Sequence, residues 1–332
     1  MAVSNRHILY QGPVILGLAK TAAGAVRQRV MSAARARLPA PIAPAPPAAP
    51  ATPGPLLRRT VKPLPRALID DYLRHVGAKP GRYPGQVPAH LFPQWSLALS
   101  TATIAKIPYP LMRVVNGGCR LEINAPLAAD EPFEVSAQLL SVDDNGRRAV
   151  MHQRIITSTR AHPEAVVGHF FAIVPLKKRA GKSGGSESGV IKDERAKKKE
   201  KKEKARGHLV PEDARELERW DLDERAGLDF ARLTGDFNPI HWVAPHARAF
   251  GFKNVILHGF STQARAFEGL ARHLAPTGQE ISALDVQFTR PLTLPARVGL
   301  FIDRDPAART IYVAARPGDP AYLVGTFETR KS

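Results

Sequence analysis

The sequence has almost no cysteine and no long apolar segment near its start. Cys119 is the single cysteine in 332 residues, so neither an intrachain disulfide nor a cysteine-rich metal cluster can form. The apolar run at residues 12–19 is far shorter than the roughly 20 residues that span a bilayer. Arginines follow it without a convincing small-residue cleavage site. We expect neither a transmembrane nor a secreted protein, and the lone thiol fits a reducing compartment such as the cytoplasm.

Acidic residues are absent from the first 66 positions, and this explains much of the net charge of +18. Residues 1–66 contain ten Lys and Arg, and residues 177–206 contain 13 basic and five acidic side chains. The rest of the chain is balanced, with 25 basic and 25 acidic residues. A nucleic-acid binder carries its basic surface on the fold itself, so no nucleic-acid partner is expected.

Composition divides the chain into five segments. We expect a basic N-terminal extension at residues 1–38, a Pro/Ala-rich linker at 39–60, a first domain at 67–176, a Lys-rich tether at 177–206 and a second domain at 208–332. The extension is a solvated segment, a membrane-surface helix making peripheral contact or an organellar presequence. The tether has little apolar content and is expected to be a solvated linker.

Both domains have the pattern of an α+β fold, in which a central helix is followed by an antiparallel meander. In the first domain a helix is expected at 67–76, and an apolar stretch at 87–107 precedes the strands. In the second domain helices are expected at 227–233 and 259–274. Strands are expected at 120–124, 133–142, 149–159, 166–174, 281–288, 297–303, 310–315 and 321–329. The repeated layout suggests a duplicated domain.

The most informative stretch is TGDFNPIH, residues 234–241. It places a carboxylate, Asp236, and an imidazole, His241, on one loop. Gly235 permits a sharp bend, and Pro239 restricts its own backbone and that of Asn238, so the two groups can be held at one point. A carboxylate and a histidine that share a water can remove its proton and return one to a neighbouring carbon.

The start of the helix at 259–274 supplies the second component of a site. Its first backbone N–H groups lack intrahelical acceptors and lie at the positive end of the helix dipole. They could bind a carbonyl oxygen as it becomes an enolate, and Gly259 would allow close approach. A base, an acid and an oxyanion donor suit proton transfer next to a thioester carbonyl.

These residues resemble the MaoC-like, (R)-specific enoyl thioester hydratases and dehydratases. The resemblance rests on TGDFNPIH at 234–241, Gly-Phe at 251–252, ILHGF at 256–260 and VQFTRPL at 286–292, and it covers residues 208–332. It implies that Asp236 and His241 activate the catalytic water and that the amide of Gly259 holds the thioester oxygen.

The first domain has no such signature and resembles the degenerate partner of family members with two hot-dog domains in one chain. The resemblance implies an α+β double hot-dog fold, a pseudo-dimer within one chain and one active site per chain. A pocket lined from the region 92–107 and assembly into a homodimer remain further expectations.

The other candidate residues are given supporting roles. Asn238 and Gly235 are expected to shape the loop, and His258 to begin the helix. No metal ion is expected, although Asp236, His241, His246 and His258 would allow one on composition. Cys119 is expected to be a buried structural thiol.

We expect an enzyme without a cofactor that hydrates trans-2-enoyl thioesters of coenzyme A or acyl carrier protein to (R)-3-hydroxyacyl thioesters. Two alternatives stay open. One is a hot-dog acyl thioesterase, for which Glu268 is the only carboxylate on the 259–274 helix. The other is a non-catalytic protein that binds acyl thioesters.

Overall fold

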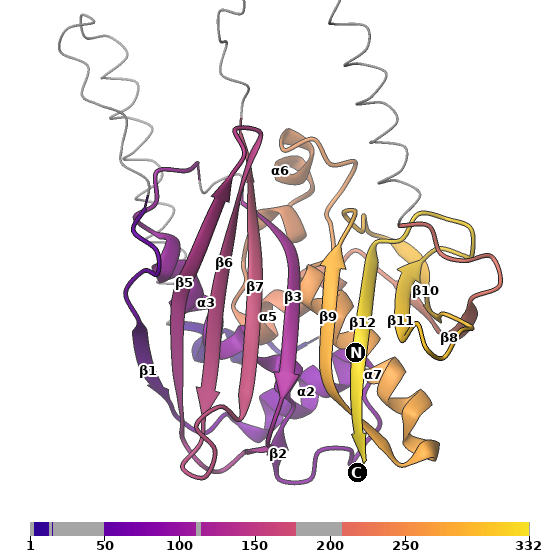
Figure 1. The fold of residues 1–332 in the computed structure, drawn as a ribbon, viewed down its shortest axis with the longest axis horizontal. Helices are drawn as coiled ribbons and strands as arrows, with labels where there is room; N and C mark the ends of the chain where they lie inside the picture. The colour runs from indigo at the N-terminus through magenta and orange to yellow at the C-terminus, as the bar shows by residue number, and fades with distance from the viewer. Residues whose placement is uncertain (1–2, 13–14, 16–49, 111–113, 177–207, 332) are drawn as a thin grey trace, which may run out of the picture.

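The structure is a computed structural model that describes residues 3–12, 15, 50–110, 114–176 and 208–331 (Figure 1). The 177–206 tether and most of the expected 1–38 extension lie outside the described residues. Among the helices that are described, none is long and apolar enough to cross a bilayer.

One ten-stranded sheet runs through the described residues, and all of its neighbouring strands are antiparallel (Figure 1). The strand order is β1-β5-β6-β7-β3-β9-β12-β11-β10-β8. The strands are β1 (Leu57–Val61), β3 (Val115–Ile123), β5 (Phe133–Asp144), β6 (Arg148–Ser158), β7 (Val166–Pro175), β8 (Arg215–Leu222), β9 (Gln279–Phe288), β10 (Ala296–Ile302), β11 (Thr310–Ala314) and β12 (Leu323–Lys331). A small second sheet pairs β2 (Gln86–Val87) with β4 (Leu127–Ala128).

The two halves of the chain build the two halves of this sheet in the same way. Each half contributes five strands, with its first strand at an outer edge and its second strand at the centre. The halves meet where β3 pairs with β9, in a register that sets Gly118 opposite Gln287 and Leu121 opposite Leu284. The repeated strand order supports duplication of one α+β unit.

The helices gather behind the sheet in the view of Figure 1. In each half a shorter helix precedes a central one: α2 and α3 in the first half, α5 and α7 in the second. The helices are η1 (Asn5–Gln11), α2 (Arg66–Val76), η3 (Ala89–Leu91), α3 (Pro93–Ile104), α5 (Ala226–Thr234), η5 (Pro239–His241), α6 (Ala244–Ala249), α7 (Gly259–Leu274) and η6 (Ala275–Thr277).

The main core lies between the sheet and these helices. Along β6 buried and partly exposed residues alternate, the period-2 pattern of a strand with one face against a core. Phe260 of α7 packs on Phe92 and Phe170 of the first half, with ring centroids 5.2 and 5.3 Å apart. Cys119 is fully buried on β3, and burial raises the pKa of its thiol. Its position is that of a structural thiol.

Three segments differ from the sequence-based expectations. β1 begins at Leu57, inside the segment expected to be linker, and pairs with β5. β8 forms where no strand was expected, and β3 begins at Val115 instead of residue 120. β1 and β8 are the two edges of the described sheet, and β8 reads RELERWDL. Charged edge strands of this kind lack the apolar alternation by which strands are recognised.

Candidate active site

The end of α5 sets up the loop that carries Asp236. Gly235 follows the helix in the left-handed conformation with φ of 83°, and its N–H donates to the carbonyl of Ala231 at 2.7 Å. This φ is accessible to glycine at little cost, and it turns the chain sharply out of the helix. Asp236 is the next residue and is partly buried.

Asn238 then begins η5, which ends at His241. The side-chain oxygen of Asn238 accepts from the N–H of Ile240 at 3.4 Å, as an N-cap residue does. The backbone N–H of Asn238 in turn donates to Oδ1 of Asp236 at 3.4 Å. Local hydrogen bonds therefore give the loop a defined shape, and Gly235 and Asn238 lie where loop-forming residues are needed.

The structure brings Asp236, His241 and His258 together. A carboxylate oxygen of Asp236 and one ring nitrogen of each histidine lie within 4.8 Å of one another. The side chain of Asp236 is 21% exposed and His241 is 8% exposed. The site is thus open to solvent mainly at the carboxylate.

His241 is oriented from its far side. Its Nδ1 lies 2.8 Å from the carbonyl oxygen of Ile256, and this nitrogen must carry a proton to donate there. In the neutral ring Nε2 is then a proton acceptor. Burial lowers the pKa of His241, and the nearby charge of Asp236 and the bond to Ile256 offset this only in part. His241 is therefore a neutral base near pH 7.

His258 has a larger place in the site than sequence reasoning gave it. It is 2% exposed, and its Nε2 donates to the backbone carbonyl of Asp236 at 2.9 Å. Its ring stacks on that of His241, with centroids 3.6 Å apart and planes 24° apart. Burial, followed by the repulsion that a protonated His241 would exert, lowers the pKa of His258 well below its usual range. A neutral His258 joins the loop to the start of α7.

Gly227 is a site residue that sequence reasoning missed. A Cβ at this position would lie 2.1 Å from the carbonyl oxygen of His241, so only glycine lets α5 pack against η5. The available signal was a glycine in the first turn of a helix, where it costs stability relative to alanine.

The first turn of α7 adds hydrogen-bond donors beside the two imidazoles. The N–H groups of Ser261 and Thr262 donate to the carbonyl of His258. Those of Gly259 and Phe260 have no hydrogen-bond acceptor among the described residues. A Cβ on Gly259 would lie 2.9 Å from the ring of Phe288, so a larger residue here would have to displace that ring. The hydroxyl of Ser261 is buried and also has no partner in the described part of the chain.

The residue types of these three side chains would allow them to bind a metal ion, but their arrangement suits acid–base chemistry better. Ligands of one metal ion must aim their donor atoms at one point. The rings of His241 and His258 instead stack face to face, and Nε2 of His258 is engaged by a backbone carbonyl. His246 lies outside the group of three.

Glu268, the carboxylate on α7, is engaged elsewhere. Its Oε1 accepts from Tyr83 at 2.6 Å and from His90 at 2.8 Å, and Arg82 lies 3.5 Å from Oε2. Its side chain has no exposed surface. Burial would raise the pKa of Glu268, but His90, Tyr83 and Arg82 outweigh it and the pKa is lowered. This ionised carboxylate ties α7 to the first half of the chain.

Comparisons with known proteins agree with this architecture. The chain is similar to HtdX of Mycobacterium tuberculosis, with a TM-score of 0.60 and 19% identity over 83% of this chain and 100% of that one. It is also similar to a Mycobacterium tuberculosis protein described as having a double hotdog fold, with a TM-score of 0.51 and 14% identity over 85% and 97% of the two chains. The fold of this protein is a double hot-dog.

The family relationship lies in the second half. Residues 208–304 match the family described as MaoC like domain. Over 73 residues the chain is 37% identical to 3-hydroxyacyl-thioester dehydratase X of Mycobacterium tuberculosis. That match spans 22% of this chain and only 25% of the length of the relative. The segment that carries the Asp236 and His241 loop thus lies within the match to the MaoC like domain.

Proposed function

We propose that the protein reversibly hydrates trans-2-enoyl thioesters of coenzyme A or acyl carrier protein to (R)-3-hydroxyacyl thioesters. The observation that carries this proposal is the convergence of Asp236 and a neutral His241 beside the start of α7. Similarity to a protein named as a 3-hydroxyacyl-thioester dehydratase supports the same substrate class.

In the proposed reaction one water donates its two O–H groups to the carboxylate of Asp236 and to Nε2 of His241. As the water oxygen bonds to C3 of the enoyl group, either Asp236 or His241 takes a proton from the water. The electron pair of the double bond moves toward the thioester oxygen, where the N–H of Gly259 stabilises the developing charge. The residue that took the proton then gives it to C2, so the product contains both parts of one water and the residue returns to its starting state.

His258 is proposed to act through its neighbours. Its bond to the Asp236 carbonyl holds the loop, and its ring fixes the plane of His241. Because its pKa is strongly lowered, His258 is neutral. It therefore places no positive charge beside His241 that would make Nε2 of His241 a weaker base.

The thioesterase alternative has less support. A thioesterase of this fold would need a free acid or nucleophile on the central helix. Glu268 is fully buried and engaged by Tyr83 and His90, so it is not available to attack a thioester carbonyl.

The test is the loss of enoyl-thioester absorbance when the purified protein meets trans-2-enoyl thioesters of short, medium and long chain, on coenzyme A and on acyl carrier protein. Asp236→Asn and His241→Ala are each expected to lower kcat by about 10²- to 10⁴-fold. Chiral analysis of the product should give the (R) alcohol. Binding of acyl thioester without turnover on any chain length or carrier would instead favour the non-catalytic alternative.

A further inference from the structure

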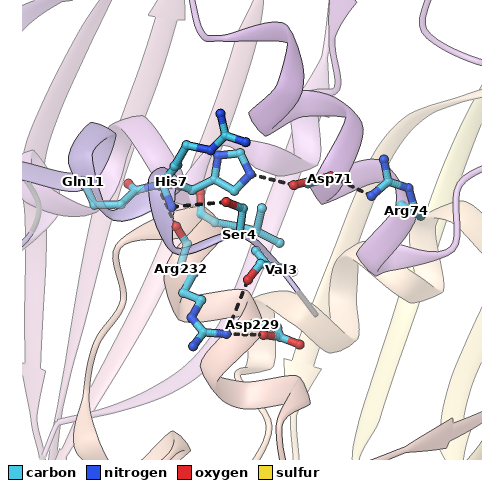
Figure 2. A network of polar contacts seen from close by, with 10 residues as sticks. Val3, Ser4, His7, Gln11, Asp71, Arg74, Asp229 and Arg232 are labelled. Atoms are coloured by element: carbon cyan, nitrogen blue, oxygen red, sulfur yellow. Dashed lines mark hydrogen bonds and ion pairs between the residues drawn. The ribbon is translucent and has the colours of Figure 1, made fainter. Parts of the chain in front are cut away.

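The N-terminal segment, residues 3–12, docks on the two halves of the fold with His7 and Gln11 directed inward (Figure 2). His7 is 3% exposed and Gln11 is fully buried, whereas Leu9 is 82% exposed. Val3 packs against the main core, but a segment held by the hydrophobic effect alone would also bury its larger apolar side chains. Specific hydrogen bonds therefore determine where this segment docks.

Gln11 caps the helix that leads into the catalytic loop. Its side-chain N–H group donates to the carbonyls of Arg232 at 3.1 Å and Leu233 at 2.9 Å. These carbonyls are in the last turn of α5, where helical carbonyls lack intrahelical partners. Only Thr234 and Gly235 separate Leu233 from Asp236 along the chain. Gln11, 222 positions from Leu233 in sequence, thus completes the end of the catalytic helix.

Further contacts hold the segment on both halves of the chain. Oε1 of Gln11 accepts from Gln94 of α3 at 3.4 Å, which joins α5 to the central helix of the first half. Nε2 of His7 lies 2.7 Å from Asp71 of α2. Burial would raise the pKa of Asp71, but its partners His7 and Arg74 outweigh it and the pKa is lowered. Figure 2 shows the contact of His7 with Asp71.

We propose that Gln11 is a positioning residue for the catalytic loop, and that residues 3–12 form a strap on which the geometry of Asp236 and His241 depends. The effect of the strap on kcat rests on the proposed function, but the link between the strap and the loop can be measured without an activity assay. The strap acts through the end of α5, because its contacts there precede the loop by only a few residues.

Gln11→Met tests the inference, because it keeps side-chain length and removes both N–H donors. Two hydrogen bonds of ordinary strength correspond to a fall in kcat of roughly 5- to 150-fold. KM should change less than about two-fold, since the hydrogen bonds of the strap go to α2, α3 and α5 rather than to the start of α7. His7→Ala releases the other anchor and should give the same pattern more weakly. Leu9→Ser, a change on the exposed side of the same segment, is the matched control and should leave kcat as in the wild type.

Hydrogen exchange gives a reading that does not depend on turnover. In Gln11→Met the amides of residues 234–241 should exchange several-fold faster than in the wild type and in Leu9→Ser, while those of β6 keep their rates. Unchanged exchange in the loop would overturn the inference whatever the activity. Faster exchange with a wild-type kcat would overturn the positioning role. A wild-type protein without enoyl hydration would overturn the proposed function, and the exchange result would still decide whether the strap holds the loop.

Discussion

At the scale of single residues, the site combines groups that the sequence places close together with groups that only the fold brings near. The motif at 234–241 predicted that Asp236 and His241 meet, because Gly235 and Pro239 constrain a short loop. The stacking of His258 on His241 joins residues 17 positions apart and has no local signature. Gly227 is likewise needed because α5 passes close to the backbone of η5, a contact that only the fold creates.

Gly227→Ala gives a prediction at this scale. The added Cβ would meet the His241 carbonyl oxygen, which is backbone and must shift as a whole. We expect a loss of about 1–3 kcal/mol in the free energy of unfolding and, since misplacement of a catalytic group by about 1 Å costs roughly 100-fold, a large fall in kcat. Denaturant unfolding and enoyl hydration measure the two effects. At Gly54 the atom nearest to an added Cβ lies 3.4 Å away, an ordinary contact far from the strap and the loop, so Gly54→Ala is the control. A Gly227→Ala protein with wild-type kcat would show that η5 does not need this close packing.

At the scale of elements, apolar periodicity predicted the elements that bury a face. The expected helix at 259–274 agrees with α7, and β9, β5 and β7 begin within two residues of the expected positions. β1 and β8 were missed because each lies at an edge of the described sheet. An edge strand is held by hydrogen bonds to one neighbouring strand, so its sequence need not show the apolar alternation of a strand with a buried face. The strap could not be predicted as docked, because the side chains that it buries, His7 and Gln11, are polar, while the large apolar side chains of Leu9 and Tyr10 are exposed.

The two central helices are joined to the opposite halves by contacts that periodicity does not reveal. His90 precedes α3, much as His258 precedes α7, and both are followed two residues later by a phenylalanine. His258 lies in the candidate site, whereas His90 is bound by Glu268. The duplicated unit thus places a histidine in the candidate site in one half and in a structural contact in the other.

Glu268→Gln tests this structural role. Removing the charge leaves Arg82 and His90 without their buried partner, and breaking such a buried network is expected to cost about 3 kcal/mol of unfolding free energy. The matched control is Glu280→Gln, whose partner Arg330 lies 3.8 Å away at the surface, where an ion pair contributes little. Denaturant midpoints compare the two variants. If Glu268→Gln kept its stability and instead abolished a thioester hydrolysis activity, the carboxylate would be catalytic.

At the scale of the whole molecule, two duplicated halves form one sheet and enclose buried histidines. The repeated helix-then-meander layout predicted the duplication from sequence. The sequence did not predict that β3 pairs with β9, because either half could have paired through a different edge strand. Burial, with the charge of Arg265, lowers the pKa of His75 to about 3, and the pKa values of His241 and His258 are also lowered.

These buried histidines predict acid sensitivity. In the unfolded chain a histidine titrates near pH 6.5, so on acidification the unfolded state takes up protons that the folded state does not. Stability should therefore be fully present above about pH 6.5 and fall as the pH is lowered toward 5. His75→Gln should remove roughly 2 kcal/mol of that loss, whereas His162→Gln, at an exposed position, should not. Unfolding free energies measured from pH 7 to pH 5 make the comparison, and equal slopes for all three proteins would contradict it.

The central claim is that Asp236 and His241 act on one water as a unit. It is tested most directly by comparing kcat for enoyl-thioester hydration in Asp236→Asn, His241→Gln and the double variant. Groups that act together give strongly non-additive losses, so the double variant should lie within a few-fold of the slower single variant. Losses that multiply, or a single variant that keeps wild-type kcat, would contradict the account.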